Sequence, residues 1–255
     1  MITTPEIIAR LRDQIRCLEH HGPVPGESVL GSGCESLDRA LPDGGVRRGS
    51  LVEWIEGSLG SGAATLALHF ARQACCEGGA LVVVDRLRQV YPPALVAWGI
   101  DLSQVILVHP RNEREEIWVW DQALRCPAVA AVWGRIERID GRSFRRLQLA
   151  VEGSGGVGLL LRPLRARWQP TWAEVRLLVE PRCCSQGRRL CVRLLHCRGA
   201  AGRGMVELEL DEWSGRLQKA RETRETHSRD LAAELARATA DRRPTGTCGA
   251  SHRTP

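Results

Sequence analysis

Short apolar runs alternate with longer segments of helical periodicity from residue 51 to residue 161. The pattern predicts strands at 51–56, 80–84, 104–108, 129–133 and 158–161, and helices at 63–77, 92–98, 113–125 and 144–152. Strands that alternate with helices imply right-handed crossovers and a mainly parallel sheet. We therefore expect an α/β fold built around a parallel central sheet.

The helical pattern stops after residue 161, and alternating apolar positions continue. They predict three further strands at 174–180, 188–197 and 205–213. No helical segment separates these strands, so we expect them to extend the sheet as antiparallel hairpins.

A separate amphipathic segment lies at the start of the chain. Thr4 and Pro5 favour the beginning of a helix, which we expect to run to about residue 19. Its apolar residues have the narrow a/d spacing of a helix that docks on a partner, and they are Ile8, Leu11, Ile15 and Leu18. The alternative is that this helix folds back on its own core. A Gly- and Pro-rich linker follows it.

These patterns divide the chain into four parts. They are the N-terminal helix (1–21), a linker and lead-in segment (22–48), the core (49–213) and a basic tail (214–255). The tail has nine Lys or Arg against five Asp or Glu, and few large apolar residues, so we expect it to be mostly disordered. The tail therefore carries most of the formal net charge of +6.

Composition excludes several classes of protein. No apolar run approaches the length of about 18 residues that a membrane span needs, and the N-terminus does not resemble a signal peptide. We therefore expect a cytoplasmic protein. The ten cysteines include adjacent pairs and scattered singles rather than a secreted disulfide pattern. The densest group is Cys183, Cys184, Cys191, His196 and Cys197, which lacks paired C-x-x-C spacing, so we expect no metal site.

The segment LVEWIEGSLGSGAATLALHF, residues 51–70, has the strand, glycine loop and helix of a phosphate-binding loop, with its glycines at Gly57, Gly60 and Gly62. A working loop continues with a lysine and a Ser or Thr that holds Mg²⁺, where this chain has Ala63 and Ala64. The only lysine of the chain is far downstream. Backbone N–H groups of the loop still suit an anion, so the prediction is a degenerate nucleotide site.

Three stretches resemble known proteins of DNA repair. GSGCESLDRALPDGGVRRGSLVEWIEG, residues 31–57, and DRLRQVYPPALVAWGID, residues 85–101, are similar in order and spacing to RecA recombinases. RNEREEIWVWDQALRCPAVAAVWGRIERIDGRSFRRLQLAVEGSGGVGLLLRP, residues 111–163, looks like ImuA, the RecA-like accessory family of bacterial mutagenic repair. The resemblance implies a RecA-like core over residues 30–213.

The resemblance also locates the residues that RecA-type ATPases use for hydrolysis. Where they have Asp-x-Glu, with the glutamate activating water, this chain has Asp85, Arg86 and Leu87. Where they have an aspartate that supports Mg²⁺, this chain has Gly134. We expect no ATPase activity, no catalytic residue and no cofactor.

In RecA two loops contact DNA, and their counterparts here are 134–142 and 163–170. The first carries Arg135, Arg138 and Arg142. The candidates for DNA binding in the second are Arg162, Arg165, Arg167 and Trp168. The alternative, which we favour slightly, is that these arginines are ordinary solvated charge. Trp118 is either a partner anchor or partly buried packing, of which packing is the commoner explanation.

The resemblance implies a non-catalytic adaptor in translesion synthesis during the SOS response to DNA damage. Its implied partners are RecA, an ImuB-like Y-family polymerase homologue and an error-prone replicative-type DNA polymerase, with weak DNA binding. Two alternatives remain open, a regulator of RecA that still binds nucleotide and a cell-division inhibitor similar to SulA.

Overall fold

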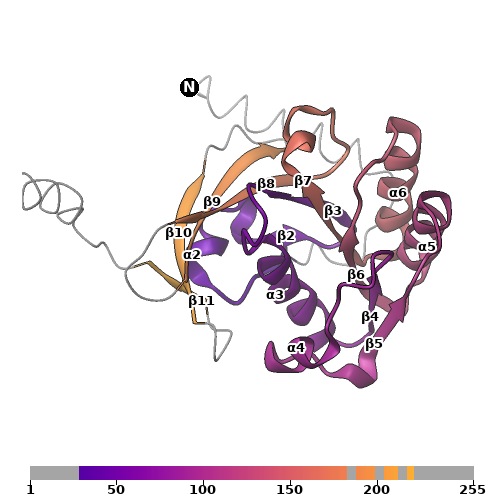
Figure 1. The fold of residues 1–255 in the computed structure, drawn as a ribbon, viewed down its shortest axis with the longest axis horizontal. Helices are drawn as coiled ribbons and strands as arrows, with labels where there is room; N and C mark the ends of the chain where they lie inside the picture. Colours follow the sequence, from indigo (N-terminus) through magenta and orange to yellow (C-terminus); the bar gives the residue numbers. More distant parts are fainter. Residues whose placement is uncertain (1–28, 183–187, 199–203, 212–216, 221–255) are drawn as a thin grey trace, which may run out of the picture. The chain divides into compact units, whose positions relative to one another are not determined.

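The computed structural model describes residues 29–182, 188–198, 204–211 and 217–220, which form an α/β fold around a nine-stranded sheet (Figure 1). The strand order is β11-β10-β9-β8-β3-β7-β6-β4-β5. The six strands from β8 to β5 run parallel, and β9, β10 and β11 are antiparallel additions at one side. A separate two-stranded sheet pairs β1 with β2.

The elements closely follow the predicted segments. The strands of the large sheet are β3 (Ser50–Glu56), β4 (Ala80–Val84), β5 (Val105–Val108), β6 (Val129–Arg135), β7 (Val157–Pro163), β8 (Val175–Arg182), β9 (Arg188–Cys197), β10 (Met205–Leu210) and β11 (Leu217–Lys219). The small sheet contains β1 (Val29–Leu30) and β2 (Val46–Arg47). The helices are α2 (Glu35–Asp38), α3 (Ala63–Cys76), α4 (Pro92–Ala97), α5 (Glu113–Arg125) and α6 (Gly141–Ser154), with 3-10 turns η1 (Pro42–Gly44), η2 (Leu102–Gln104) and η3 (Leu164–Trp168).

Both faces of the parallel sheet are covered. Successive side chains of β3 point to opposite faces, so Trp54 belongs to the core under α3 and Leu51 to the core under α5 and α6. In the first core, Trp54 packs on Phe70 with ring centroids 5.5 Å apart. In the second, Trp120 of α5 is fully buried. Helices on both faces are what a parallel sheet of apolar strands requires.

Side-chain caps fix where α5 and α6 begin. The side chain of Asn112 accepts a hydrogen bond from the backbone N–H of Glu115, and that of Asp140 accepts one from Ser143, each at 2.9 Å. Such caps satisfy N–H groups that the helix itself leaves free. Both helices therefore begin at defined positions beside the loops that follow β5 and β6.

The structure differs from the predicted fold at the side of the sheet. We expected antiparallel hairpins from residue 174 onward, but β8 runs parallel to β3, with Trp54 opposite Leu177. The connection from β7 to β8 contains only the 3-10 turn η3 and no α-helix. Parallel strands are usually joined by a helix, so the sequence pattern did not predict a parallel β8. Leu217–Lys219, placed in the tail by sequence, pairs with β10 as strand β11.

The predicted N-terminal helix and all of the tail beyond residue 220 lie outside the described residues. None of the helices in the described part of the chain has the length and apolar character that a bilayer span requires.

Candidate functional site: a degenerate nucleotide loop and its surroundings

The glycine loop keeps its strand-to-helix frame between β3 and α3, and two of its backbone N–H groups bond within the loop. Gly62 precedes α3 with φ of +88°, a left-handed conformation that suits glycine. The N–H of Ser61 donates to the Ser58 carbonyl at 3.1 Å, and the N–H of Ala63 approaches the Ser61 hydroxyl oxygen at 3.4 Å. Two N–H groups near the start of α3 thus already have partners within the loop.

Side chains from β9 close over this loop. A Cβ atom built on Gly62 would lie 2.7 Å from a terminal carbon of Leu190, which is fully buried. The guanidinium of Arg188 donates to the Gly60 carbonyl. The Gly57 N–H is bonded to the carbonyl of Val179 in β8, at 2.9 Å. The loop is therefore packed against the strands beside it.

Ala63 and Ala64, the two residues that follow the glycine loop, pack into the core under α3. Ala63 is fully buried, and the carbonyl of Ala64 accepts a hydrogen bond from the Trp133 indole N–H at 3.3 Å. Trp133 comes from β6, directly before Gly134. A large aromatic side chain thus lies against the first turn of α3.

Gly134 sits where β6 passes very close to β4. A Cβ atom at this position would lie 2.4 Å from the Val84 carbonyl oxygen. Real Cβ atoms do not approach a backbone atom so closely, so a side chain here requires the two strands to move apart. The position where the resemblance implies a metal-supporting aspartate is therefore too tight for a side chain in this arrangement of the strands.

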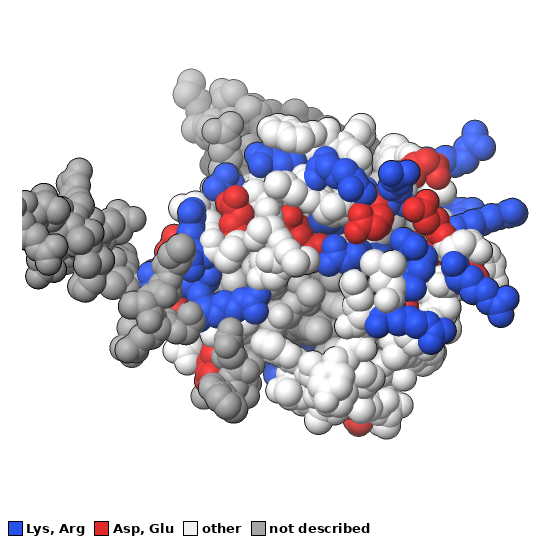
Figure 2. All heavy atoms as spheres, in the orientation of Figure 1, with Lys and Arg blue, Asp and Glu red and all other residues white. Residues whose placement is uncertain are grey.

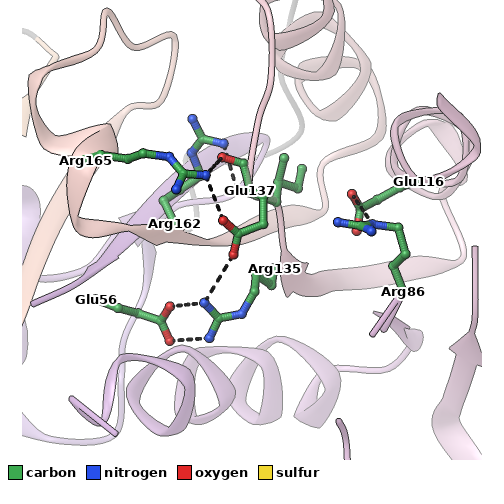
Figure 3. Close-up of polar contacts among 8 residues, drawn as sticks. Glu56, Arg86, Glu116, Arg135, Glu137, Arg162 and Arg165 are labelled. Atoms are coloured by element: carbon green, nitrogen blue, oxygen red, sulfur yellow. Dashed lines mark hydrogen bonds and ion pairs between the residues drawn. The ribbon is translucent and has the colours of Figure 1, made fainter. Parts of the chain in front are cut away.

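The residues after β4 have structural roles. Both carboxylate oxygens of Asp85 accept hydrogen bonds from the turn that follows, at 3.0 Å from the N–H of Gln89 and 2.8 Å from that of Val90. The guanidinium of Arg86 is 3.2 Å from the carboxylate of Glu116 on α5 (Figure 3). Burial raises the pKa of Glu116, and Arg86 opposes this shift. Leu87 is half-exposed beside them.

An ion-pair network links the carboxyl ends of β3 and β6 (Figure 3). Arg135 binds the Glu56 carboxylate with both terminal nitrogens, one of them at 2.7 Å. Glu137 lies 3.7 Å from Arg135 and accepts a hydrogen bond from Arg165 of η3 at 2.8 Å. This network fastens the loop after β6 both to the glycine-loop strand and to η3.

A cavity of about 280 Å³ lies between α3, α4 and the ends of β4 and β6. Its walls are mostly apolar and include Leu68, Leu95, Trp98 and Trp133. The Thr65 hydroxyl also lines it, as does the Arg135–Glu137 pair. The volume of this cavity is close to that of a small-molecule site.

The DNA-binding prediction is wrong for Arg162. Its side chain is buried in β7, with an exposed fraction of 1 % for the residue, and lies 3.3 Å from the Glu53 carboxylate of β3. It donates to the Ile136 carbonyl at 2.8 Å and to the side chain of Gln169 at 3.0 Å. Burial lowers its pKa and Glu53 opposes that shift. Arg162 therefore holds the two loops together and has no access to a phosphate.

Sequence reasoning missed the buried cluster to which Arg162 belongs. The carboxylate of Glu53 is also 2.6 Å from the Arg176 guanidinium and accepts a hydrogen bond from the Thr171 hydroxyl at 2.7 Å. Arg176 also donates to the backbone carbonyl of Gln169 at 2.7 Å. The available signal was a glutamate in the middle of the apolar run LVEWI, because a buried charge needs a partner.

The other three DNA-binding candidates lie together on η3. Arg165 is exposed and paired with Glu137, while the guanidinium of Arg167 lies 4.4 Å from the centroid of the Trp168 ring. Trp168 has an exposed fraction of 79 %. Trp168 and Arg167 thus form an exposed cation–π pair. DNA binding by Arg165, Arg167 and Trp168 remains a prediction.

Three further predictions concern the N-terminal residues, Trp118 and the cysteine group. The partner-binding candidates Ile8, Leu11, Ile15 and Leu18 lie outside the described residues. Trp118 has an exposed fraction of 58 %, which disfavours the packing interpretation. Among described His, Cys, Asp and Glu residues, no group of three lies close enough to hold a metal ion. Cys183 and Cys184 of the dense group lie outside the described residues.

The fold and the loop place this protein among RecA-like α/β domains. The sequence profile of the RecA N-terminal domain matches residues 18–133. The crystal structure of the RadB recombinase superposes with a TM-score of 0.60 at 19 % identity, covering 75 % of this chain and all of that one. These two matches confirm the predicted fold class.

The similarity to curated proteins is more specific. Protein ImuA of Caulobacter vibrioides is 34 % identical over 138 residues, 52 % of this chain and 57 % of that protein. Protein RecA of Clostridium acetobutylicum is 33 % identical over 104 residues, 41 % of this chain and 30 % of that one. The match thus spans just over half the length of its ImuA relative. The comparisons confirm the resemblance of this chain to the ImuA family and to RecA.

Proposed function

We propose that this chain is a non-catalytic, RecA-like accessory protein of a translesion synthesis complex. Its similarity to ImuA supports the setting in DNA repair. The architecture of the degenerate loop supports the absence of catalysis. In this proposal the RecA-like scaffold serves as a set of binding surfaces, because a fold fixes the position of a site but not its chemistry.

The observation that carries the proposal is the packing around Gly134. Hydrolysis of a nucleoside triphosphate needs a metal-supporting carboxylate, a lysine and a group that orients water. Here β4 closes against Gly134, Trp133 bonds to the first turn of α3, and Asp85 caps a turn. Other contacts hold these residues at the positions where that machinery would lie, so a single substitution does not restore it.

The proposed partners are RecA, an ImuB-like Y-family polymerase homologue and an error-prone replicative-type DNA polymerase. We propose that the N-terminal residues Ile8, Leu11, Ile15 and Leu18 dock on RecA or on a second copy of the chain. Weak DNA binding by Arg165, Arg167 and Trp168 would bring the complex to damaged DNA.

A pull-down from DNA-damaged cells, followed by reconstitution with purified components, tests the adaptor function. We expect the chain to retain RecA and the ImuB-like protein together, and to bind each separately after purification. Binding of neither component in the purified system would contradict the proposal.

A second candidate function is a regulator of RecA that still binds nucleotide, and the cavity of about 280 Å³ beside Thr65 is the observation in its favour. Its apolar walls and the carboxylate of Glu137 suit a triphosphate poorly. Isothermal titration with ATP and Mg²⁺ separates the two candidates. Micromolar binding would favour the regulator, and no heat of binding favours the adaptor.

A further inference from the structure

A groove of about 690 Å³ runs between the N-terminal ends of α5 and α6, on the sheet face opposite α3. We call it the α5–α6 groove. Three arginines line it, Arg114 from α5, Arg138 from the loop before α6, and Arg146 from α6. Trp118 forms part of its wall. Figure 2 shows blue side chains projecting from the side of the molecule on which α5 and α6 lie.

Among the described residues, three arginines at or beside this groove have no carboxylate partner. In the part of the chain that the structure describes, Arg114, Arg138 and the adjacent Arg142 form no ion pair. By contrast, Arg146 lies 3.3 Å from Asp121. Unpaired guanidinium groups on a structured surface can form charge-assisted, bidentate hydrogen bonds with carboxylates.

The positions of the arginines on α6 oppose the helix dipole. Arg142, Arg145 and Arg146 lie in the first two turns of α6, where the partial positive charge of the helix disfavours a cation. Helix α5 shows the stabilising arrangement, with Glu113, Glu115 and Glu116 in its first turn and Arg125 in its last. The arginines at the start of α6 therefore do not stabilise the helix itself.

The floor of the groove is apolar. Ile117 and Ile139 line it from α5 and from the loop, and both are partly buried against the core under α5 and α6. The Trp118 ring stands beside them with an exposed fraction of 58 %. An exposed tryptophan next to an apolar depression is typical of the anchor site in a protein interface.

We propose that the α5–α6 groove binds an acidic segment of a partner protein, which places one large apolar side chain against Trp118 and carboxylates on Arg114 and Arg138. The inference is independent of the adaptor function proposed above, since it concerns only the chemistry of this groove. The chain's own tail is a poor occupant, because residues 214–255 have nine basic against five acidic residues.

The acidic side chains at the groove favour a peptide over a nucleic acid. Glu113 and Asp140 line it together with the arginines. The pKa of Asp140 is lowered by its hydrogen bonds to Ser143, which keeps this carboxylate ionised. A nucleic acid carries a phosphate at every nucleotide and would meet these carboxylates, whereas a peptide can place acidic side chains only opposite the arginines.

Fluorescence anisotropy with the full chain tests the proposal. The probe is a short, dye-labelled synthetic peptide with one central phenylalanine between aspartates and glutamates. One control peptide replaces the acids by their amides, and another replaces phenylalanine by alanine. The protein variants are Arg114→Glu combined with Arg138→Glu, and Trp118→Ala. Arg88→Glu is the matched control, because Arg88 is exposed and lies outside the groove.

We expect micromolar binding of the acidic peptide, weakened at least about tenfold by the double charge reversal and by either peptide control. Trp118→Ala weakens it about fivefold or more, and Arg88→Glu leaves it unchanged. Equal melting temperatures show that the variants are folded. Unchanged binding by the double variant overturns the proposal, as does the absence of peptide binding to the unmodified chain. Preferential, groove-dependent binding of an oligothymidylate overturns it in favour of a nucleic-acid site.

Discussion

Glu53 is a charged residue inside the sheet, and its neighbours determine its effect on stability. Its carboxylate neutralises only one of two buried guanidinium groups, those of Arg162 and Arg176. Removing Glu53 would leave both guanidinium groups uncompensated, which costs at least about 3–5 kcal/mol, whereas removing either arginine leaves one neutral pair. Each substitution in this cluster therefore tests whether these buried contacts stabilise the loops that contain Ile136 and Gln169.

We expect Arg162→Ala to lower the free energy of unfolding by about 2–4 kcal/mol, because the buried Ile136 carbonyl and the Gln169 side chain lose their donor and the large side chain leaves a cavity, while Glu53 keeps Arg176 as its partner. Arg165→Ala, which removes an exposed pair, should cost less than about 1 kcal/mol. Urea denaturation measures both values. Equal effects of the two substitutions would contradict the buried position of Arg162.

The adjacent residues Cys75 and Cys76 should differ in reactivity. Burial raises the pKa of Cys75 to about 11, and the neighbouring Cys76 thiol adds to the shift. Cys76 is exposed. Since only the thiolate reacts, Cys75 should be alkylated at pH 8 about a hundredfold more slowly than a thiol of ordinary pKa. Site-resolved mass spectrometry measures the rates, and equal labelling of both cysteines would show that Cys75 is accessible.

The sequence identifies these residues only in part. Arg162 follows an apolar run and precedes a proline, a position that suggests a loop arginine. Its burial depends on Glu53, more than a hundred residues earlier in the chain, which the parallel pairing of β3 and β7 brings onto the neighbouring strand, two residues before Ile55, the register partner of Arg162. The hydrophobic pattern of a segment does not show which strand it pairs with. It can therefore predict that residues form a strand, but not which distant residue is the partner of a buried charge.

Restoring the expected residues in the loop between β3 and α3 should not restore ATP hydrolysis. The double variant Ala63→Lys with Ala64→Thr restores the loop residues but not the metal carboxylate at Gly134 or a base at Leu87. We expect no phosphate release from this variant, measured with ATP and Mg²⁺. Turnover above background would show that the rest of the site is intact.

The close approach of β4 and β6 can be tested separately. Gly134→Ala should destabilise the protein by about 1–3 kcal/mol, because its Cβ atom would lie 2.4 Å from the Val84 carbonyl oxygen. Gly141→Ala is the matched control, since no atom lies within 4 Å of its Cβ position. Thermal unfolding compares the two, and an equally stable Gly134→Ala variant would argue against the tight strand pair.

The element η3 carries the remaining DNA-binding candidates. If Arg165 and Arg167 each meet a phosphate, replacing both with alanine should flatten the dependence of log K on log salt by up to about two units. Trp168→Ala should weaken binding to single-stranded DNA without changing that slope. An unchanged slope in the double variant would leave both arginines as ordinary surface charge.

Most elements could be predicted from periodicity because each carries its own pattern. Helix α5 occupies the expected residues, and β4 does as well. The pairing of β8 could not be predicted, because a strand reads the same whether it runs parallel or antiparallel. The α5–α6 groove was also missed, since it forms only when two helix ends and a loop meet.

For the molecule as a whole, the docking role of the N-terminal residues remains a prediction. Deleting residues 1–21 should leave a soluble, folded core that no longer binds RecA or self-associates, since the a/d seam would be lost. Gel filtration and binding to immobilised RecA measure this. Aggregation of the truncated chain would indicate that these residues cover the apolar surface of their own core.

We propose that the chain is a RecA-like accessory protein that does not hydrolyse ATP. A phosphate-release assay on the purified full chain, with ATP and Mg²⁺ and with or without single-stranded DNA, tests this directly. We expect no release above background in either condition. DNA-stimulated release that disappears in the Gly62→Val variant would contradict it.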